Sequence, residues 1–598
     1  MAGLFFLPGL AAANSTEIIP DPGAGGTWTV QWFTVTNQLN LSQPGAPMQT
    51  ESMRVNAVEF NGVSFTISAF DYPSGTPINQ DPSNLWTLMG AQRGVRADQI
   101  VVIDINDPLY ANGGVINFYF SPPNWEYVPN TGNSTVRVYT PAGWRQVMAA
   151  TGTTAMTTPM DNRNITTVQL GADIDLRNDQ LNGTFNLNRN KQSLTINGLK
   201  PGASGSVGSS VNTLAEARSN YFTFVDFFPT TANPLDVNNT TTVPAAGTLN
   251  SFTWSNTVII TGSGTGVIYA QGRTGFTQNF NNIFHIGPQL AQANLGQVNL
   301  GNTISIIQDP RFHSTAALTS NSFTYIDANG QVQNIILNMG RGTVSYWGSA
   351  ANASNVTLSG DTHIFRSNRN GTNTSTANVS RHGVFSIFGT AGNLRIADNS
   401  NVTIIHNHTH TSNANGLTPL VRAAGGYNIH VGNNSDFSFT NAHHINTNTT
   451  AASRPRNIVV GSNSNVDFQS TLINTSTAAA GRVPYLNMSG QMIIGNNSTV
   501  NISSPQNRRV PLLVAADNAN ALNINGGTLN VSGWYNHTGN ANIGMVRASN
   551  VSINSEGSAN LINHATGGPV LHANQVNVNT EGGFVVAGNH GANHLSNI

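Results

Sequence analysis

The chain has 598 residues and no cysteine, and its 25 Lys and Arg residues balance 26 Asp and Glu residues to give a formal net charge of -1. Only 9% of its residues are charged, against about 25% in an average soluble protein. The lack of cysteine excludes disulfides, thiolate metal sites and a cysteine nucleophile. The lack of a basic excess argues against nucleic acid as a partner, because phosphate binding requires a concentrated positive face.

The polarity of the chain comes from Asn, Thr, Ser and 59 Gly residues instead of from charge. Disorder is the simplest explanation of such a composition. It is rejected because polar residues alternate with Val, Ile, Leu and Phe at period two in many short runs, as they do in half-buried strands. The sequence therefore predicts an all-β protein.

The first residues resemble the end of a secretory signal peptide. Residues 3–10 form a short apolar run, and Ala11, Ala12 and Ala13 supply small residues for cleavage. The run is too short to span a bilayer, and the alternative is a short buried strand. We expect residues 1–13 to be a residual signal-like segment, and the protein to be secreted or associated with a cell wall without membrane insertion.

Two segments precede the main part of the chain. Residues 14–26 are rich in Pro and Gly and predict a linker. Residues 27–138 alternate well, as in TWTVQWFTVTNQLNL and VNAVEFNGVSFTISAF. They predict a small β domain whose role the sequence does not indicate.

A short amphipathic helix is expected directly after this domain, in the segment YTPAGWRQVMAATG. Thr140 is suited to the N-cap and Pro141 to the first helical position. Trp144, Val147 and Met148 fall on one face of the helix. Such a helix can cover the apolar interior and the unpaired edge at the start of a stack of strands.

The region from residue 139 to residue 598 is rich in short strands, less regular over residues 204–350, and after about residue 350 the chain visibly repeats itself. Each unit consists of a strand, a turn of Gly, Asn and Ser, a second strand and a loop of variable length. When the small residue of each turn is aligned, the positions are Thr362, Ser400, Ser435, Ser464, Ser498, Thr528 and Ser558. A period of about 30 residues that tolerates insertions is typical of a solenoid.

The repeated turn has a structural role in this interpretation. In MIIGNNSTVNIS and its relatives, Gly and Asn lie at a sharp corner, where both tolerate left-handed backbone. Stacked Asn side chains can hydrogen-bond from coil to coil, while flanking apolar residues such as Ile493 and Val500 point into a continuous core. The expected turn positions are Gly432, Asn434, Gly461, Asn463, Gly495, Asn497 and Gly526.

These features predict a right-handed parallel β-helix over residues 139–598, with coils of about 30 residues and the short helix as its N-terminal cap. The repeat pattern still continues at ANHLSNI, the last residues of the sequence. We therefore expect the repeat region to be truncated at its C-terminus.

Four segments of the repeat region are distinctive. They are PAGWRQVMAA, TTVQLGADIDL, LTINGLKPG and VIYAQGRTGFTQNFNNIFHIGPQLAQANLGQVNLGNTISI. Together they resemble the pectate lyase-like adhesive domain of Gram-positive surface proteins, in which a run of the form L-x-x-D-I-x-L … L-T-I-N-G opens a right-handed β-helix. The resemblance covers residues 140–598 and implies a protein displayed on a cell wall, with adhesion as its role.

The acidic residues of the repeat region are scattered, which argues against an enzyme. Pectate lyases and polygalacturonases need carboxylates that converge, because hard cations and general-acid chemistry both require them. Asp398, Asp436 and Asp467 occupy related turn positions at different offsets from the aligned serine, so we expect them on different faces. A stack of Ca²⁺ sites there is only a weak expectation, and no other cofactor is expected. Arg395 and Arg422 would be the bases of a lyase, but no carboxylate cluster supports that role.

The strongest metal-binding candidate is the segment IHNHTHT. His406, His408 and His410 alternate, so in a strand they would line one face about 6.5–7 Å apart. Two imidazoles at that spacing could share Zn²⁺ or Ni²⁺. The alternative is an exposed polar strand face that binds no metal.

Two further segments have plainer explanations. GSGTGV at 262–267 lacks the Lys-Ser/Thr of a nucleotide-binding loop and a following helix, so a glycine-rich turn is favoured. YFTFVDFF at 221–228 could stack on sugar rings, but such a run is more often part of a core.

The sequence thus favours a non-enzymatic secreted or cell-surface adhesin, whose β-helix presents a polar face to carbohydrate, a cell-wall polymer or a host surface ligand. One alternative is a polysaccharide lyase or glycoside hydrolase of pectate-lyase-like fold. Another is a structural protein that self-associates into fibres, because solenoid ends can pair. The capping helix argues against pairing at the N-terminal end of the repeats.

Overall fold

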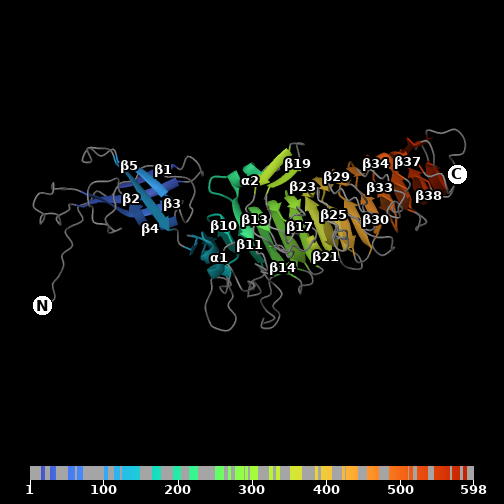
Figure 1. Ribbon diagram of the computed structural model, residues 1–598. Coiled ribbons are helices and arrows are strands. Elements are labelled where there is room, and N and C mark those ends of the chain that lie inside the picture. The colour runs from blue at the N-terminus through green and yellow to red at the C-terminus, as the bar shows by residue number, and fades with distance from the viewer. Residues whose placement is uncertain are drawn as a thin grey trace, which may run out of the picture.

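The computed structural model describes residues 15–20, 27–35, 52–60, 63–71, 100–105, 114–121, 124–128, 130–148, 165–176, 193–203, 214–226, 250–261, 267–270, 276–287, 290–293, 296–307, 322–326, 332–336, 350–366, 384–387, 392–406, 420–423, 426–441, 454–470, 484–508, 511–515, 521–536, 544–565, 569–579 and 583–588. The structure is nearly all β, as the alternation predicted. Figure 1 shows a first group of strands in blue and a long series of strands that follow one another from green to red.

The first group is a six-stranded antiparallel sheet with the strand order β1-β2-β3-β4-β6-β5. Its members are β1 (Ser15–Pro20), β2 (Thr27–Val35), β3 (Ser52–Phe60), β4 (Val63–Asp71), β5 (Ile100–Ile105) and β6 (Gly114–Ser121). Five of these strands fall within the segment predicted to form a small β domain.

The linker predicted for residues 14–26 is partly a strand. β1 pairs antiparallel with β2, with Ser15 opposite Trp32 and Pro20 opposite Thr27. The prediction treated the prolines and glycines of this segment as breakers. A proline at the end of an edge strand removes no ladder bond that the sheet needs, so it is compatible with β1. The signal-like residues 1–13 lie outside the described residues.

The long sheet begins before residue 139, where the sequence analysis placed its boundary. β7 (Trp125–Tyr127) and β8 (Thr135–Val138) form an antiparallel pair, and β8 pairs in parallel with β9 (Thr167–Leu170). Both strands therefore belong to the long sheet and not to the small domain predicted over residues 27–138. Periodicity could not show this, because strands of both units alternate with the same period.

The predicted helix forms over Pro141–Met148 (α1). The Thr140 hydroxyl oxygen accepts a hydrogen bond from the Gly143 amide at 2.9 Å, which is the expected N-cap. A side chain at Gly143 would collide with the carbonyl of Asn124, so glycine lets the helix approach the chain segment before β7. Figure 1 shows α1 at the start of the long sheet.

The inner face of α1 closes the first coils of the core. Trp144, Val147 and Met148 are fully buried, as the sequence predicted. The Trp144 ring centroid lies 4.6 Å from that of Phe224 and 6.0 Å from that of Trp254. The helix thus covers apolar side chains that the first strands would otherwise expose.

Replacing Thr140 with alanine should weaken this cap. The change removes the acceptor for the Gly143 amide, and such N-cap substitutions cost about 1 kcal/mol. We expect faster amide hydrogen exchange in the peptide covering residues 141–148, with the rest of the sheet unchanged. Thr140→Ser keeps the hydroxyl and serves as the control; equal exchange in the two variants would refute the capping role.

The stacked coils contain three parallel ladders, named A, B and C in the order in which one turn of the chain visits them. Ladder A has the shortest strands, and its first part is a separate five-stranded sheet: β14 (Ile268–Ala270), β16 (Ala291–Ala293), β21 (Ala350–Ala353), β24 (Phe385–Ile387) and β27 (Val421–Ala423). Its second part belongs to the long sheet: β32 (Leu486–Asn487), β35 (Leu513–Ala515) and the first parts of β38 (Val546–Asn554) and β40 (Leu571–Asn579).

Ladder B contains β8, β9, β11 (Ser193–Asn197), the first parts of β13 (Ser251–Thr261) and β15 (Thr277–Ile286), β17 (Gln297–Gly301), β22 (Asn355–Ser359), β25 (Gly392–Ile396), β28 (Tyr427–Val431), β30 (Pro455–Val460), β33 (Met492–Ile494), β36 (Leu522–Asn525) and the second parts of β38 and β40.

Ladder C contains β10 (Ile174–Asp175), β12 (Phe222–Asp226), the second parts of β13 and β15, β18 (Ile304–Ile307), β23 (Asp361–Arg366), β26 (Asn401–His406), β29 (Asp436–Asn441), β31 (Asn465–Ser470), β34 (Thr499–Arg508), β37 (Thr528–Tyr535), β39 (Ser558–Asn563) and β41 (Gly583–Gly588).

A complete turn of the chain contributes one strand to each ladder, as β27, β28 and β29 do, while some turns, such as that of β30 and β31, have described strands only in ladders B and C. Each strand pairs in parallel with its counterpart in the next turn, so β28 is bonded to β30 and β29 to β31. The result is a long, mostly parallel stack of coils, in keeping with the solenoid that the repeat predicted.

Alternation along each strand decides which side chains enter the core. In β28, Tyr427, Ile429 and Val431 are buried, while Asn428 and His430 are half-buried and face outward. Parallel pairing places equivalent residues of successive coils side by side. The inward residues therefore merge into one apolar core, and the outward residues form continuous rows along the molecule.

Besides the first sheet, α1 and β7, three elements lie outside the ladders: α2 (Leu214–Asn220) and the two strands of an antiparallel hairpin, β19 (Ser322–Ile326) and β20 (Val332–Ile336), inserted between β18 and β21. Within the described part of the chain, no helix combines the length and the apolarity needed to cross a membrane.

Candidate ligand-binding face

The outward residues of ladder B form a first polar row. Gln297, Asn355, Asn393 and Asn428 occupy the same register position on β17, β22, β25 and β28. Asn393 donates a side-chain hydrogen bond to Asn355 at 2.8 Å, and Asn428 donates one to Asn393 at 3.0 Å. Asn457 extends the row by donating to Asn428 at 3.2 Å. The row is thus a chain of side-chain amides, and their hydrogen bonds to one another fix their orientation.

A second row lies two residues further along the same strands. Asn299, Thr357, Arg395 and His430 are register neighbours on the four strands. This row differs from the first because a hydroxyl, a guanidinium and an imidazole replace the amides. It therefore adds charge and titratable groups to an otherwise uncharged face.

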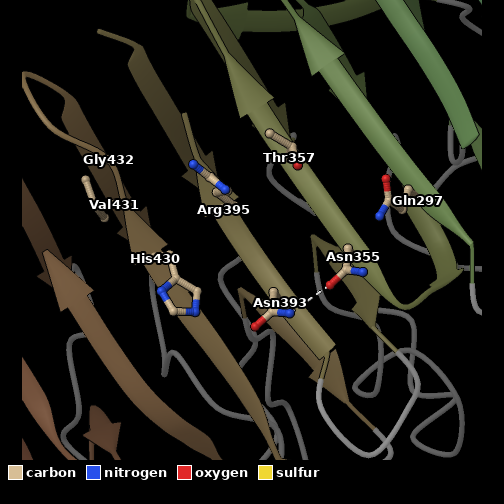
Figure 2. Close-up of a pocket in the computed structure, with 8 residues that line it drawn as sticks. All are labelled: Gln297, Asn355, Thr357, Asn393, Arg395, His430, Val431 and Gly432. Atoms are coloured by element: carbon tan, nitrogen blue, oxygen red, sulfur yellow. Dashed lines mark hydrogen bonds between the residues drawn. The ribbon is translucent and has the colours of Figure 1, made fainter. Parts of the chain in front are cut away.

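The two rows line a pocket of about 550 Å³, formed by Gln297, Asn355, Thr357, Asn393, Arg395, His430, Val431 and Gly432. Figure 2 shows the four strands side by side, with Arg395 between Thr357 and His430 and the Asn355–Asn393 hydrogen bond next to it. Every lining side chain except Val431 and Gly432 offers a polar group. The pocket is therefore suited to a ligand with many hydroxyl or acidic groups.

Arg395 gives the pocket its charge. Its side chain is exposed and makes no ion pair or hydrogen bond with any residue that the structure describes. The residues that line the described pocket include no carboxylate. The guanidinium is therefore available to an anionic group of a ligand, for which its planar fork of donors is well matched.

His430 is coupled to this charge. Burial lowers the pKa of the His430 imidazole below its usual 6.5, and the positive charge of Arg395 lowers that pKa further. The imidazole is therefore neutral near pH 7 and becomes charged only as the pH falls through the lowered value. In the free protein this shift costs stability as the pH falls below 6.5, because the unfolded chain protonates its histidine more readily.

An anionic polymer should consequently bind more tightly at pH 5 than at pH 7.5. Protonation of His430 places a second positive charge beside Arg395, and a bound carboxylate favours that protonation. Titration of polygalacturonate at both pH values checks this. The variant His430→Gln should lose most of the pH dependence, and a variant that kept the full dependence would show that another group is responsible.

The corner between ladders B and C carries the repeated turn. Asn399, Asn434, Asn463 and Asn497 have φ values of 56°, 53°, 54° and 53°, the left-handed region in which Asn is tolerated. Asn434 donates to Asn399 at 3.2 Å, Asn463 to Asn434 at 3.2 Å and Asn497 to Asn463 at 3.4 Å. The exposed side-chain amides thus form a chain of hydrogen bonds along the corner, and this chain has a structural role.

The glycines of this turn act differently from the prediction. Of the four expected positions only Gly526 has a positive φ, at 68°. At Gly432, Gly461 and Gly495 the coils approach so closely that a side chain would collide with the preceding turn. A Cβ at Gly461, for example, would lie 2.9 Å from the carbonyl carbon of Gly432. These three glycines are required by coil-to-coil contact and not by left-handed backbone.

A buried column of serines supports the same corner. The amides of Ser400, Ser435 and Ser464 donate to the hydroxyl oxygens of Ser435, Ser464 and Ser498 in the next coil, at 3.3, 3.2 and 3.0 Å. Thr362, Thr528 and Ser558 were aligned with this column, but Thr362 pairs with Val402 and Thr528 with Thr499. The alignment fails there because Thr362, Thr528 and Ser558 lie within the strand that follows the turn, one or two register positions past the column.

The predicted metal site at His406, His408 and His410 falls largely outside the described residues. His406 is the last residue of β26, where only the backbone is described, and the other two histidines lie beyond it. Among the residues that the structure does describe, no three His, Asp or Glu side chains gather as metal ligands would. The histidine motif thus remains a sequence-based hypothesis.

The three aspartates considered for Ca²⁺ lie in three different register positions. Asp398 is in the corner and accepts a hydrogen bond from the Asn433 amide at 2.9 Å. Asp436 begins β29 and accepts one from Asn465 at 2.8 Å. Asp467 is the third residue of β31, where burial raises the pKa of its carboxyl group. The three carboxylates are thus distributed along the coils instead of converging.

The structure describes only part of the remaining segments that the sequence analysis singled out. Tyr221, Phe222 and Phe224 are buried, so the described portion of YFTFVDFF belongs to the core. Most of GSGTGV and the side chain of Arg422 lie outside the described residues.

Sequence reasoning named Arg395 only as a candidate base and missed the pocket around it. The relevant signal was present, because the polar lining residues are all outward residues of the strand that precedes the turn between ladders B and C. To place those residues in one pocket, one must know which residues of successive coils lie side by side, and the coils differ in length.

No protein-family model and no curated protein sequence matches the chain. Two solved structures are similar, both of serine-rich repeat proteins (SRRP) of Lactobacillus reuteri. The SRRP of strain 100-23 has 12% identity and a TM-score of 0.31, over 77% of this chain and 98% of that chain. The SRRP of strain 53608 has 12% identity and a TM-score of 0.24, over 76% and 99% respectively. Similarity at this level does not support a conclusion about function. No family model matches the chain in support of its resemblance to pectate lyase-like adhesive domains.

Proposed function

We propose that this protein is a non-enzymatic adhesin, secreted or held on a cell surface, that binds polymeric carbohydrate on the outer face of ladder B. The observation that carries the proposal is the pocket of about 550 Å³ around Arg395, an exposed guanidinium without a described partner between two polar rows. Carbohydrate chains with carboxylate or sulfate groups match this combination of one cation with many hydrogen-bonding groups.

The form of the face favours a polymer over a small molecule. The amide row continues from Asn355 through Asn393 and Asn428 to Asn457, so similar hydrogen-bonding groups recur from coil to coil. A chain of repeating sugars can bond to several coils at once. Each contact is weak, but their number raises the overall avidity.

The proposed architecture is a right-handed parallel β-helix. The three ladders have the connectivity of such a helix, and parallel crossovers are right-handed in almost all proteins. A stack of coils of this kind is stiff along its axis. It would hold the binding face at a distance from its attachment point, as an adhesin requires.

Binding without cleavage is part of the proposal. Glycoside hydrolysis uses two carboxyl groups across the scissile bond, and pectate lyases use acidic clusters for Ca²⁺. The described pocket lining offers Gln, Asn, Thr, Arg and His, and Asp398 accepts a hydrogen bond from a backbone amide in the corner. Retention of the polymer is therefore favoured over its hydrolysis or elimination.

The test is a binding array of glycans and wall polymers, run beside a cleavage assay on polygalacturonate with and without Ca²⁺. We expect binding to acidic polysaccharides with no shortening of the chains. Unsaturated products that disappear when EDTA is added would overturn the proposal and favour a lyase.

A further inference from the structure

A second surface feature lies on ladder C, away from the Arg395 pocket on ladder B. Trp534 is on the outer side of β37 and is 40% exposed, one of three large hydrophobic residues that the described part of the chain leaves open to solvent. Ser532 precedes it on the same outer side, and His564 follows β39 in the next coil. We call Ser532, Trp534 and His564, with the neighbouring Asn530 and Asn560, the Trp534 platform.

The indole of Trp534 is held in place from one side. The His564 ring centroid lies 5.6 Å from that of Trp534, with an angle of 36° between the planes. Ser532 Oγ lies 2.9 Å from His564 Nε2, and the His564 amide donates to the Gly533 carbonyl at 2.8 Å. The backbone bond and the side-chain bond together fix the imidazole, so the exposed indole is a preorganised surface.

A row of hydrogen-bonding groups lies further along the same strands, with Asn530 four residues before Trp534, roughly 13 Å in an extended strand. Asn530 donates to Asn501 at 2.9 Å, and Asn560 donates to Asn530 at 2.9 Å. Asn560 ends this row within the described residues, and no described residue donates a hydrogen bond to its side-chain oxygen. That oxygen is available to accept a hydroxyl hydrogen from a ligand.

The two strands of the platform carry no charged residue: β37 and β39 contain no Asp, Glu, Lys or Arg. Between residues 526 and 579 the described residues include two charged side chains, Arg547 in the ladder A part of β38 and Glu556 in the turn before β39. In the preceding coil, Arg508 at the end of β34 is the register partner of Tyr535. Because β37 and β39 themselves are uncharged, an uncharged ligand is favoured here, in contrast to the Arg395 pocket.

We propose that the Trp534 platform is a binding site for uncharged sugar rings whose hydroxyl groups are equatorial. Such a ring presents C–H groups on its face and hydroxyls at its edge. The C–H groups carry partial positive charge and pack against the negative face of an indole. Edge hydroxyls of that ring then reach Ser532, two residues away on β37, and a neighbouring sugar of the same chain reaches the Asn530–Asn560 row.

The test is a titration of the full chain with cellohexaose and chitohexaose by calorimetry. We expect the wild type to bind at least one of them, and Trp534→Ala to weaken that binding about fivefold to tenfold or more. Trp534→Phe should lie between the two, because a smaller ring retains part of the stacking surface. Tyr127→Ala, which removes an aromatic residue that is 36% exposed elsewhere, should bind as the wild type does.

Two outcomes would overturn the inference. One is a wild type that binds neither hexasaccharide, and the other is equal binding by the wild type and Trp534→Ala. Arg395→Ala separates this site from the proposed function, because it should weaken polygalacturonate binding and leave hexasaccharide binding unchanged. Circular dichroism of each variant confirms that it folds.

Discussion

Replacing Trp254 with alanine is expected to destabilise the N-terminal end of the long sheet by about 3–5 kcal/mol. Trp254 is fully buried in β13, and its ring lies 4.9 Å from Phe224 and 6.0 Å from Trp144 of the capping helix. Its indole nitrogen donates to the Thr257 hydroxyl at 3.0 Å. The substitution therefore leaves a large cavity between the cap and the first coils, and the Thr257 hydroxyl keeps only its hydrogen bond to the Ser255 carbonyl.

Hydrogen exchange is the appropriate measurement for this variant, because stacked coils need not unfold as a single cooperative unit. Exchange should accelerate in α1, β11 and β13 and much less in the coils after β28. Trp534→Ala provides a matched control, since it removes the same side chain from an exposed position. Equal effects of the two substitutions would show that the cluster around Trp254 does not stabilise this end.

Replacing Arg395 with alanine should have the largest effect on ligand binding. The guanidinium is the cation of a pocket whose described lining has no carboxylate. A hydrogen bond to a charged group contributes about 1.5–3 kcal/mol, so we expect acidic polysaccharide to bind at least about tenfold more weakly. Stability should change little, because the side chain is exposed.

The control for this prediction is Arg547→Ala, which removes an equal charge from the ladder A face. Arg395→Lys should retain part of the binding, because lysine keeps the charge but loses the planar fork of donors. Binding of polygalacturonate in low salt measures all three variants. If Arg395→Ala and Arg547→Ala reduced affinity equally, the effect would be one of net charge and not of the pocket.

The repeated turn could be predicted because its chemistry is local. Asn434, Asn463 and Asn497 occur in nearly identical tetrapeptides, and left-handed corners favour Asn and Gly regardless of what lies elsewhere. The role of Gly432 and Gly461 could not be read in this way. It depends on the approach of the preceding coil, which is a tertiary contact.

The pocket lay beyond sequence reasoning for a related reason. Asn355, Asn393 and Asn428 are side by side but 38 and 35 residues apart, because each coil carries a loop of its own length. Without the register, the outward residues of successive coils cannot be assigned to one row. Of the pocket residues, only Arg395 was singled out from the sequence. As an isolated arginine it suggested a catalytic base and not part of a binding face.

The capping helix shows the opposite case. Thr140, Pro141 and the spacing of Trp144, Val147 and Met148 specify its start and its buried face within one short segment. The start of the sheet at β7 could not be found locally. β7 pairs with β8, and β8 joins the sheet by pairing with β9, with Thr135 opposite Thr167, 32 residues further along the chain and a little more than one coil away.

The most direct test of the central claim is hydroxyl-radical footprinting of the protein with and without polygalacturonate. The account predicts that the polymer protects His430, on the ladder B face, from labelling. Trp534, on ladder C, should be labelled equally in both samples. Protection confined to Trp534, or no protection at His430 when the polymer is bound, would contradict the assignment of the binding face to ladder B.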